Sequence, residues 1–410
     1  MYILYAPPRT YGQLPPGSIP ITPDVKFYNN VAYCPKFFWY KQHITQGFID
    51  LTPRWMQRLR KKRTLNSILF ISTGGFGDVM WSMPVIREVR SLYPKARIFV
   101  ATNQRTLHLF DNFPYADVFL PYDFFAIQGL IHSCDEVFDF GGIATFLKKE
   151  MSMEPVEACF YHVSIDPPKN KNFMLPHIVL TIDEGKSAKS FLLSKGIDVT
   201  NSSLISMSAE SSTPNRNYPT HYLYDLALAL QKDGHQVVIL SESGSFRDRS
   251  SSTCTCGYEF DFTSSAPPLA LTYQCPVCKS YRFIDHFGLP AGICDLSGLT
   301  TFRQALAVIA MSNLFVGPAS SLVIASTSLS IPTIGLYGAF DPHRLSKYYH
   351  RFSFLYKKIK CSNCSEHWTE CRFGYPSPCM KLLTPPLVYE RIKYMLTRYP
   401  RQPISRIPFE

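Results

Sequence analysis

Ile68-Leu-Phe-Ile-Ser-Thr-Gly-Gly-Phe-Gly-Asp-Val79 combines a short apolar run, a glycine-rich turn and the beginning of a helix. The apolar run is typical of a buried parallel strand, and apolar residues at helical spacing follow Asp78. Glycines let the backbone turn sharply and approach a ligand, while a helix N-terminus offers unpaired N–H groups to an anion. Asp78 adds a carboxylate at this turn, suited either to capping the helix or to accepting a proton. The stretch therefore predicts a βα unit with a ligand-binding turn.

Strand-like and helix-like segments alternate along most of the chain. The strand-like runs are residues 68–72, 97–101, 117–120, 136–140, 177–181, 204–208, 236–240, 293–296, 313–316 and 333–337. Helical patterns lie between several of them, among others at 186–193, 221–232, 301–311 and 321–329. Such alternation predicts an α/β protein whose parallel sheets are covered by helices on both faces.

The alternation restarts near residue 204, which predicts two Rossmann-like doubly wound domains. We expect the first at 64–198 and the second at 199–384, followed by a C-terminal helix and tail at 385–410. A pair of dehydrogenase-type domains is the alternative, but the Gly-x-Gly-x-x-Gly fingerprint with its downstream acidic residue is not found.

Two segments differ from this pattern. Residues 1–63 are rich in proline and short β-like pieces, and predict a small accessory module that ends in a basic linker at 54–63. An insertion at 247–286 in the second domain contains Cys254-Thr-Cys256 and Cys275-Pro-Val-Cys278. Two close cysteine pairs can form a tetrahedral thiolate site, for which Zn²⁺ is the usual ion. We therefore expect a zinc-ribbon-like insertion in which the metal supplies folding free energy.

A second group of cysteines is found near the C-terminus, at Cys361, Cys364, Cys371 and Cys379. Its spacing is compatible with a metal site and with simple packing of an irregular crossover, and both readings stay open. The chain has 12 cysteines and no recognisable export signal, which indicates a reducing compartment. No apolar run is long enough to span a membrane. We therefore expect a cytoplasmic protein.

The net charge is +11, with 42 Lys plus Arg against 31 Asp plus Glu. This excess suits anionic partners such as nucleotide sugars, phosphorylated glycolipids or nucleic acid.

Four segments together resemble the family-9 glycosyltransferases, the bacterial heptosyltransferase group. They are the Gly75-Phe-Gly77-Asp78 turn with its helix, the segment from Ser206 to Pro219, Asp295-Leu-Ser-Gly-Leu-Thr-Thr-Phe-Arg-Gln-Ala-Leu306, and Ile331-Pro-Thr-Ile-Gly-Leu-Tyr-Gly-Ala-Phe-Asp-Pro342. Their order and spacing carry the resemblance, which covers residues 66–395 apart from the insertion. It implies a metal-independent, inverting transferase of GT-B fold that uses a nucleotide-diphosphate sugar.

The resemblance also implies roles for single residues. Asp78 matches the catalytic base, which deprotonates an acceptor hydroxyl. Arg216 stands where the family usually has lysine, and would neutralise the leaving diphosphate. The helix N-terminus after Ser320 would add stabilisation by its dipole. The residues expected to bind the donor are Gly74, Gly75, Gly77, Ser211, Ser212, Arg216, Ser320, Ser321 and Leu322.

One loop departs from the family pattern, which reads Asp-Ser/Thr-Gly-x-x-His. This chain has Ala319-Ser-Ser-Leu-Val-Ile324, so both the acidic residue and the histidine are replaced. Three functions remain as hypotheses: a glycosyltransferase acting on a cell-envelope saccharide or glycolipid, one acting on hydroxylated bases of DNA, and a GT-B protein that binds without turnover. The Gly-Gly-Phe-Gly-Asp turn favours an enzyme.

Overall fold

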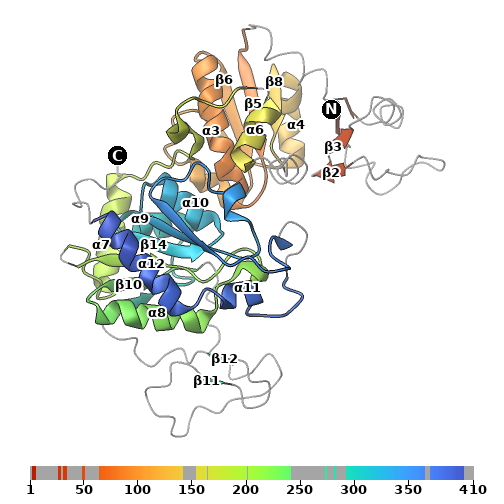
Figure 1. Cartoon of the computed structure of the whole chain (residues 1–410). Coiled ribbons are helices and arrows are strands. Elements are labelled where there is room, and N and C mark those ends of the chain that lie inside the picture. Colours follow the sequence, from red (N-terminus) through yellow and green to blue (C-terminus); the bar gives the residue numbers. More distant parts are fainter. Residues whose placement is uncertain are drawn as a thin grey trace. The chain divides into compact units, whose positions relative to one another are not determined.

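The computed structural model describes residues 64–141, 154–163, 165–200, 202–241, 292–364 and 370–400, together with short strands at 2–5, 26–28, 31–34, 49–50, 273–274 and 281–282. The chain divides into two compact units, Met1–His177 and Ile178–Glu410 (Figure 1). Among the described residues, no helix has the length and apolar character needed to cross a bilayer.

Unit 1 contains a parallel sheet with the strand order β7-β6-β5-β8. Its strands are β5 (Ser67–Ser72), β6 (Arg97–Thr102), β7 (Val118–Pro121) and β8 (Glu136–Asp139). Its α-helices are α3 (Phe76–Leu92), α4 (Phe124–Ser133) and α6 (Pro155–Val163). The apolar residues of β5 are buried on both faces, which explains why its sequence shows no polar alternation. The chain runs from β5 to β6 and β7 on one side and then adds β8 on the other, so the strand order reverses between β5 and β8.

Unit 2 contains a parallel sheet with the order β13-β10-β9-β14-β15-β16. Its strands are β9 (Leu204–Met207), β10 (Gln236–Ile239), β13 (Ile293–Asp295), β14 (Leu314–Pro318), β15 (Thr333–Tyr337) and β16 (Phe352–Tyr356). Here the strand order reverses between β9 and β14, because β10 and β13 extend one side and the later strands extend the other.

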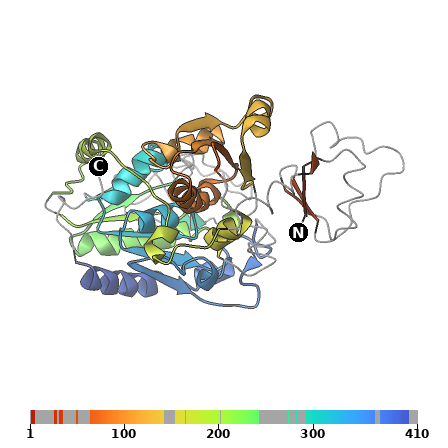
Figure 2. The same cartoon turned by 90° about the horizontal axis from the view of Figure 1, so that it is seen from above.

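Helices cover both faces of this sheet (Figure 2). On one face, α8 (Thr220–Lys232) and α12 (Pro385–Arg398) pack together over an apolar cluster with the strands. On the other lie α9 (Phe302–Ala310) and α10 (Ser321–Ser328), and α7 (Ile182–Ser194) packs against α9. The prediction of an α/β protein with parallel sheets is therefore confirmed.

Several local predictions differ from the structure. The strand expected at 177–181 is wrong, because that segment is extended but makes only an isolated bridge at Leu180. The sixth strand of unit 2, β16, was not predicted. The division between the units falls after His177 rather than at 198, because α7 packs on α9 of unit 2.

In residues 1–63 and in the insertion at 247–286, the structure describes only short strands. In residues 1–63, β1 (Tyr2–Tyr5), β2 (Lys26–Tyr28), β3 (Val31–Cys34) and β4 (Ile49–Asp50) form an antiparallel sheet in the order β2-β3-β1-β4. In the insertion, β11 (Tyr273–Gln274) and β12 (Tyr281–Arg282) pair antiparallel. The expected zinc ligands Cys254, Cys256, Cys275 and Cys278 lie outside the described residues, so the accessory module and the zinc ribbon stay predictions.

Candidate functional site

Asp78 lies at the turn between β5 and α3. Its Oδ2 accepts a hydrogen bond from the Gly75 N–H at 3.1 Å, so the carboxylate caps the beginning of the helix while remaining partly exposed. Gly77 lies in the same first turn of α3. Asn103 supports the turn, since its side-chain amide donates to the Gly74 carbonyl at 3.0 Å. The geometry is compatible with both predicted uses of Asp78, the cap and the base.

The environment of Asp78 also includes the thiol of Cys159 on α6. Burial is the main cause that raises the pKa of Cys159, and the Asp78 carboxylate raises it further. Cys159 is fully buried, as expected for a small apolar core residue.

In unit 2, predicted donor-binding residues from two distant segments meet where the strand order reverses. Ser211 and Arg216 follow β9, while Ala319 and Ser320 follow β14. The Ser211 hydroxyl donates to the Ala319 carbonyl at 3.2 Å, and Arg216 Nη1 donates to the same carbonyl at 3.0 Å. In open parallel α/β sheets, ligands bind outside the carboxyl ends of the strands at such a reversal. The structure therefore gathers these residues at the position expected for a nucleotide.

Further contacts fix the orientation of the Arg216 guanidinium. Nε donates to the Thr213 hydroxyl at 2.6 Å, and Nη2 donates to the Ser212 hydroxyl at 2.6 Å. The guanidinium carbon also lies 5.2 Å from the centroid of the Phe340 ring. Hydrogen bonds in its plane and an aromatic ring against its face hold the cation in one orientation.

The loop after β14 offers a helix N-terminus beside Arg216. Ser320 is the N-cap of α10, and Ser321 and Leu322 begin its first turn. The Ser320 hydroxyl oxygen is buried and has no hydrogen-bond partner among the described residues. Ile324, which replaces the histidine of the family pattern, is buried at 6% exposure. The backbone N–H groups that could receive a phosphate thus do not depend on the two replaced side chains.

Two carboxyl groups at strand ends were not predicted from the sequence as site residues. Glu210, after β9, accepts a hydrogen bond from the hydroxyl of Ser241, which follows β10. Asp139, the last residue of β8, accepts a hydrogen bond from the Gly141 N–H at 2.8 Å, and burial raises its pKa to about 6. The sequence signal that both share is an acidic residue close to the carboxyl end of a strand-like run.

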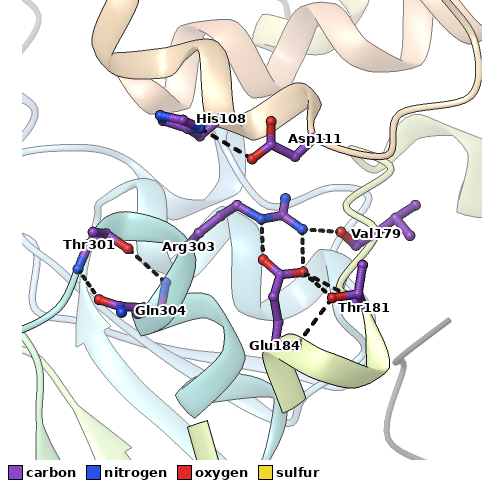
Figure 3. A network of polar contacts seen from close by, with 8 residues as sticks. All are labelled: His108, Asp111, Val179, Thr181, Glu184, Thr301, Arg303 and Gln304. Atoms are coloured by element: carbon purple, nitrogen blue, oxygen red, sulfur yellow. Dashed lines mark hydrogen bonds and ion pairs between the residues drawn. The ribbon is translucent and has the colours of Figure 1, made fainter. Parts of the chain in front are cut away.

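An ion-pair network joins α7 to α9 within unit 2 (Figure 3). Arg303 Nε contacts Glu184, and Arg303 Nη2 donates to Glu184 Oε2 at 2.7 Å and to the Val179 carbonyl at 2.6 Å. Burial alone would raise the pKa of Glu184, but hydrogen bonds from Arg303 and Thr181 lower it. Thr181 and Glu184 also form a reciprocal cap at the beginning of α7. Arg303, which belongs to one of the family-like segments, therefore has a structural role.

For the C-terminal cysteines, the sequence left both metal binding and simple packing possible. The pKa of Cys379 is raised to about 11, chiefly by burial and in part by the thiols of Cys364, Cys361 and Cys371, which places the four near one another. Cys364 accepts a hydrogen bond from the side-chain amide of Asn215. Within the described residues, however, no three His, Cys, Asp or Glu side chains are placed to hold a metal ion. The described cysteines form no disulfide bonds, and both interpretations of the group stay open.

Comparison with known proteins shows which family and which fold this chain resembles. Residues 286–373 match the profile of glycosyltransferase family 9 (heptosyltransferase). No curated protein matches the chain. Among solved structures, E. coli ADP-heptose LPS heptosyltransferase II is 18% identical, with a TM-score of 0.58 over 81% of this chain and 99% of that chain.

Two further structures agree. A family-9 glycosyl transferase from Veillonella parvula is 12% identical, with a TM-score of 0.59 over 82% of this chain and 99% of that one. The iron-containing dodecameric glycosyltransferase TibC from enterotoxigenic E. coli is 14% identical, with a TM-score of 0.55 over 86% of this chain and 79% of that one. At such identities the structures establish the fold. The resemblance of this chain to glycosyltransferase family 9, with its GT-B fold, is therefore confirmed.

Proposed function

We propose that this protein is a glycosyltransferase that moves a sugar from a nucleotide-diphosphate donor to a hydroxyl group of a saccharide or glycolipid. The observation that carries the proposal is the meeting of Ser211, Arg216 and Ser320 at the strand-order reversal of unit 2. Two segments about a hundred residues apart supply these groups: the family-like segment from Ser206 to Pro219, and the loop at 319–324, which departs from the family pattern. The family profile also matches the segment that contains Ser320.

Unit 2 would bind the donor. Arg216 would neutralise the negative charge that develops on the diphosphate as it leaves, and the first N–H groups of α10 would bind a phosphate oxygen. Since Arg216 is already oriented by its hydrogen bonds and by Phe340, little reorganisation is needed when the charge develops. These protein groups supply positive potential for the leaving group, and we propose that transfer does not require a metal ion.

Asp78 of unit 1 would act as the general base. Its carboxylate accepts the proton of the acceptor hydroxyl while that oxygen forms a bond to the anomeric carbon of the sugar. The bond between the anomeric carbon and the diphosphate oxygen breaks, and the nucleotide diphosphate leaves with the electron pair. Attack from the face opposite the leaving group inverts the configuration at the anomeric carbon. The Gly75 N–H orients the Asp78 carboxylate through one of its oxygens.

Two of the similar solved structures suggest where to begin with the donor. One is the E. coli ADP-heptose LPS heptosyltransferase II, and another is TibC in complex with ADP-D-β-D-heptose. We therefore place ADP-linked heptoses and hexoses first among candidate donors and an anionic envelope glycan first among acceptors. Ala319 and Ile324, which replace the family's acidic residue and histidine, are expected to change which sugar is accepted.

The two other hypotheses have less support. The DNA-base hypothesis rests on the basic run at 54–63 and on the cysteines of the insertion, which lie outside the described residues, and we do not propose it. A protein that binds without turnover would not need the carboxylate of Asp78, although that carboxylate also caps α3.

A thermal-shift panel of ADP-, UDP-, GDP- and CDP-linked sugars tests the donor half of the proposal. A ligand at 100 times its Kd stabilises the native state by about 2.7 kcal/mol, which is readily measured. We expect at least one nucleotide sugar to stabilise the protein. A panel without any stabilising compound would contradict donor binding.

Substitution of the base tests the catalytic half. Asp78→Asn keeps the size of the side chain and removes the proton acceptor, so we expect kcat to fall about 10²- to 10⁴-fold while the donor-induced thermal shift is retained. Wild-type turnover by Asp78→Asn would show that Asp78 only caps the helix.

A further inference from the structure

Asp139 occupies the same edge of the unit 1 sheet as the turn that carries Asp78. The strand order of this sheet reverses between β5 and β8, and ligands of open parallel sheets bind outside the carboxyl ends of the strands at such a reversal. The Asp78 turn follows β5, and Asp139 is the last residue of the neighbouring strand β8, aligned with Ile71. The alignment continues one residue further, since the Phe140 N–H donates to the Ile71 carbonyl at 2.7 Å. The two carboxyl groups therefore flank one strand-order reversal.

The face of the sheet on which Asp139 lies is otherwise apolar. Phe138 and Phe140 stack on Phe70 on one face of the sheet, at centroid distances of 5.4 and 5.8 Å. Because side chains alternate along a strand, Val137 and Asp139 belong to the opposite face. There, Val137 packs against a buried cluster of Leu69, Ile71, Ala101, Ile127 and Cys134. Packing alone would favour an aliphatic residue at position 139.

Among the residues that the structure describes, no cation offsets the burial of the Asp139 carboxyl group. Burial raises its pKa to about 6, and within the described part of the chain only the Gly141 N–H opposes this effect, through its hydrogen bond to Oδ1. The residue nevertheless keeps some exposure to solvent. A carboxyl group that is partly desolvated without a cation destabilises the fold, and such groups are concentrated at functional sites.

We propose that Asp139 binds the acceptor: its carboxylate accepts a hydrogen bond from a hydroxyl of the acceptor saccharide and so orients the hydroxyl that Asp78 deprotonates. This inference rests on the proposed function. A carboxylate has only acceptor sites, which match the donating hydroxyl groups of a sugar, and the bond to Gly141 leaves acceptor capacity on both oxygens. Unit 1 thereby holds two carboxyl groups with separate tasks, in which Asp78 takes the proton and Asp139 positions the group that gives it.

The test separates acceptor binding from donor binding. Asp139→Asn keeps the oxygen that accepts from Gly141 and removes the negative charge, so the local structure is retained. The acceptor probe is a glycan array that includes neutral, carboxylated and phosphorylated saccharides, and the saccharide that binds wild-type protein best is then titrated. We expect Asp139→Asn to weaken its binding at least tenfold, while the thermal shift caused by the nucleotide sugar changes less than twofold in apparent Kd.

Asp111→Asn is the matched control, because it removes one carboxylate of the same unit from an exposed pair with His108 and should change neither affinity. Equal saccharide binding by Asp139→Asn and wild type would overturn the inference. Parallel loss of donor and saccharide binding, with a lowered Tm, would also overturn it by showing a structural role.

The proposed function and the role of Asp139 can be refuted by different outcomes. A wild-type protein that binds no nucleotide sugar refutes the donor site itself. One that binds a nucleotide sugar but no saccharide of the array overturns the acceptor role of Asp139 and leaves the donor site of unit 2 unaffected.

Discussion

The substitution Gly74→Ala tests whether the position of Asp78 matters. A Cβ atom on residue 74 would lie 2.7 Å from the Cβ of Asp78 and 3.0 Å from its Oδ2, and contacts of Cβ atoms below 3.0 Å are essentially never observed. Since the Gly74 backbone is outside the left-handed region, alanine brings no strain other than this collision. The Asn103 side chain holds Gly74 through its carbonyl, so Asp78 is the group expected to move.

The size of the effect follows from the overlap. Ordinary contact begins at 3.4 Å, so Asp78 has to move by several tenths of an ångström or more. Overpacking of this kind costs about 1–3 kcal/mol, and a displacement of about 1 Å at a reacting group lowers the rate by about 100-fold. We expect kcat for sugar transfer to fall about 10- to 100-fold, with cooperative unfolding retained.

Gly75→Ala is the comparison, because its Cβ would lie 3.6 Å from Asp78 Oδ2, which is an ordinary contact, and its N–H is kept. The assay is the initial rate of nucleotide diphosphate release at saturating donor, with a thermal unfolding curve for each variant. Gly75→Ala should lose much less activity than Gly74→Ala. If Gly74→Ala transfers sugar as fast as wild type, the assignment of Asp78 as a positioned base is refuted.

Three further predictions concern stability and metal content. Arg303→Met leaves the carboxylate of Glu184 partly buried without its partner, so the free energy of unfolding measured in urea should fall by about 3 kcal/mol. Arg303→Met combined with Glu184→Gln should lower it less. Equal losses of stability would argue against coupling between the two residues. Asp139→Asn should stabilise the protein more at pH 8 than at pH 5. The pKa of Asp139 is about 6 in the folded state and about 4 in the unfolded state, so the unfolded state loses the proton first as the pH rises. The carboxyl group therefore destabilises the fold increasingly between about pH 4 and pH 6, and fully above about pH 6. At pH 8 the free energy of unfolding of this variant should exceed that of wild type by at most about 3 kcal/mol, and by less because Asp139 is partly exposed. Chemical unfolding at both pH values measures this difference, and an equal difference at pH 5 and pH 8 would contradict the prediction. Elemental analysis of the intact chain should find about one zinc ion, lost in Cys275→Ser combined with Cys278→Ser; a metal-free wild type would exclude the zinc ribbon.

Local sequence patterns predicted the elements of the fold where burial and turn chemistry agree. The strand, turn and helix of residues 67–92 could be predicted because an apolar run, glycines and helical spacing follow one another directly. The segment 177–181 misled the prediction because Ile178 and Leu180 are buried, as in a strand, yet among the described residues the segment makes only the single bridge at Leu180. Alternation shows which side chains are buried, whereas only tertiary pairing decides whether the backbone joins a sheet.

The candidate site depends on strand order, which the sequence does not show directly. Ser211 and Arg216 were named from a family-like segment, and Ser320 from the helix N-terminus at the loop 319–324. The hydrogen bonds of Ser211 and Arg216 to Ala319 show that the fold brings the two segments together. Asp139 was missed because a single acidic residue at a strand end has no periodic signal. Its significance arises only once β8 is known to pair with β5 at the reversal.

Calorimetric titration of wild-type protein and Arg216→Ala with ADP, UDP and GDP tests the central claim most directly. A hydrogen bond to a charged group contributes about 1.5–3 kcal/mol, and every 1.4 kcal/mol is a tenfold change in Kd. We predict that wild type binds one of these diphosphates, that Arg216→Ala binds it about 10- to 100-fold more weakly, and that Arg216→Lys retains most of the affinity. Equal affinity of wild type and Arg216→Ala, or no binding of any diphosphate, would contradict a donor site at the strand-order reversal of unit 2.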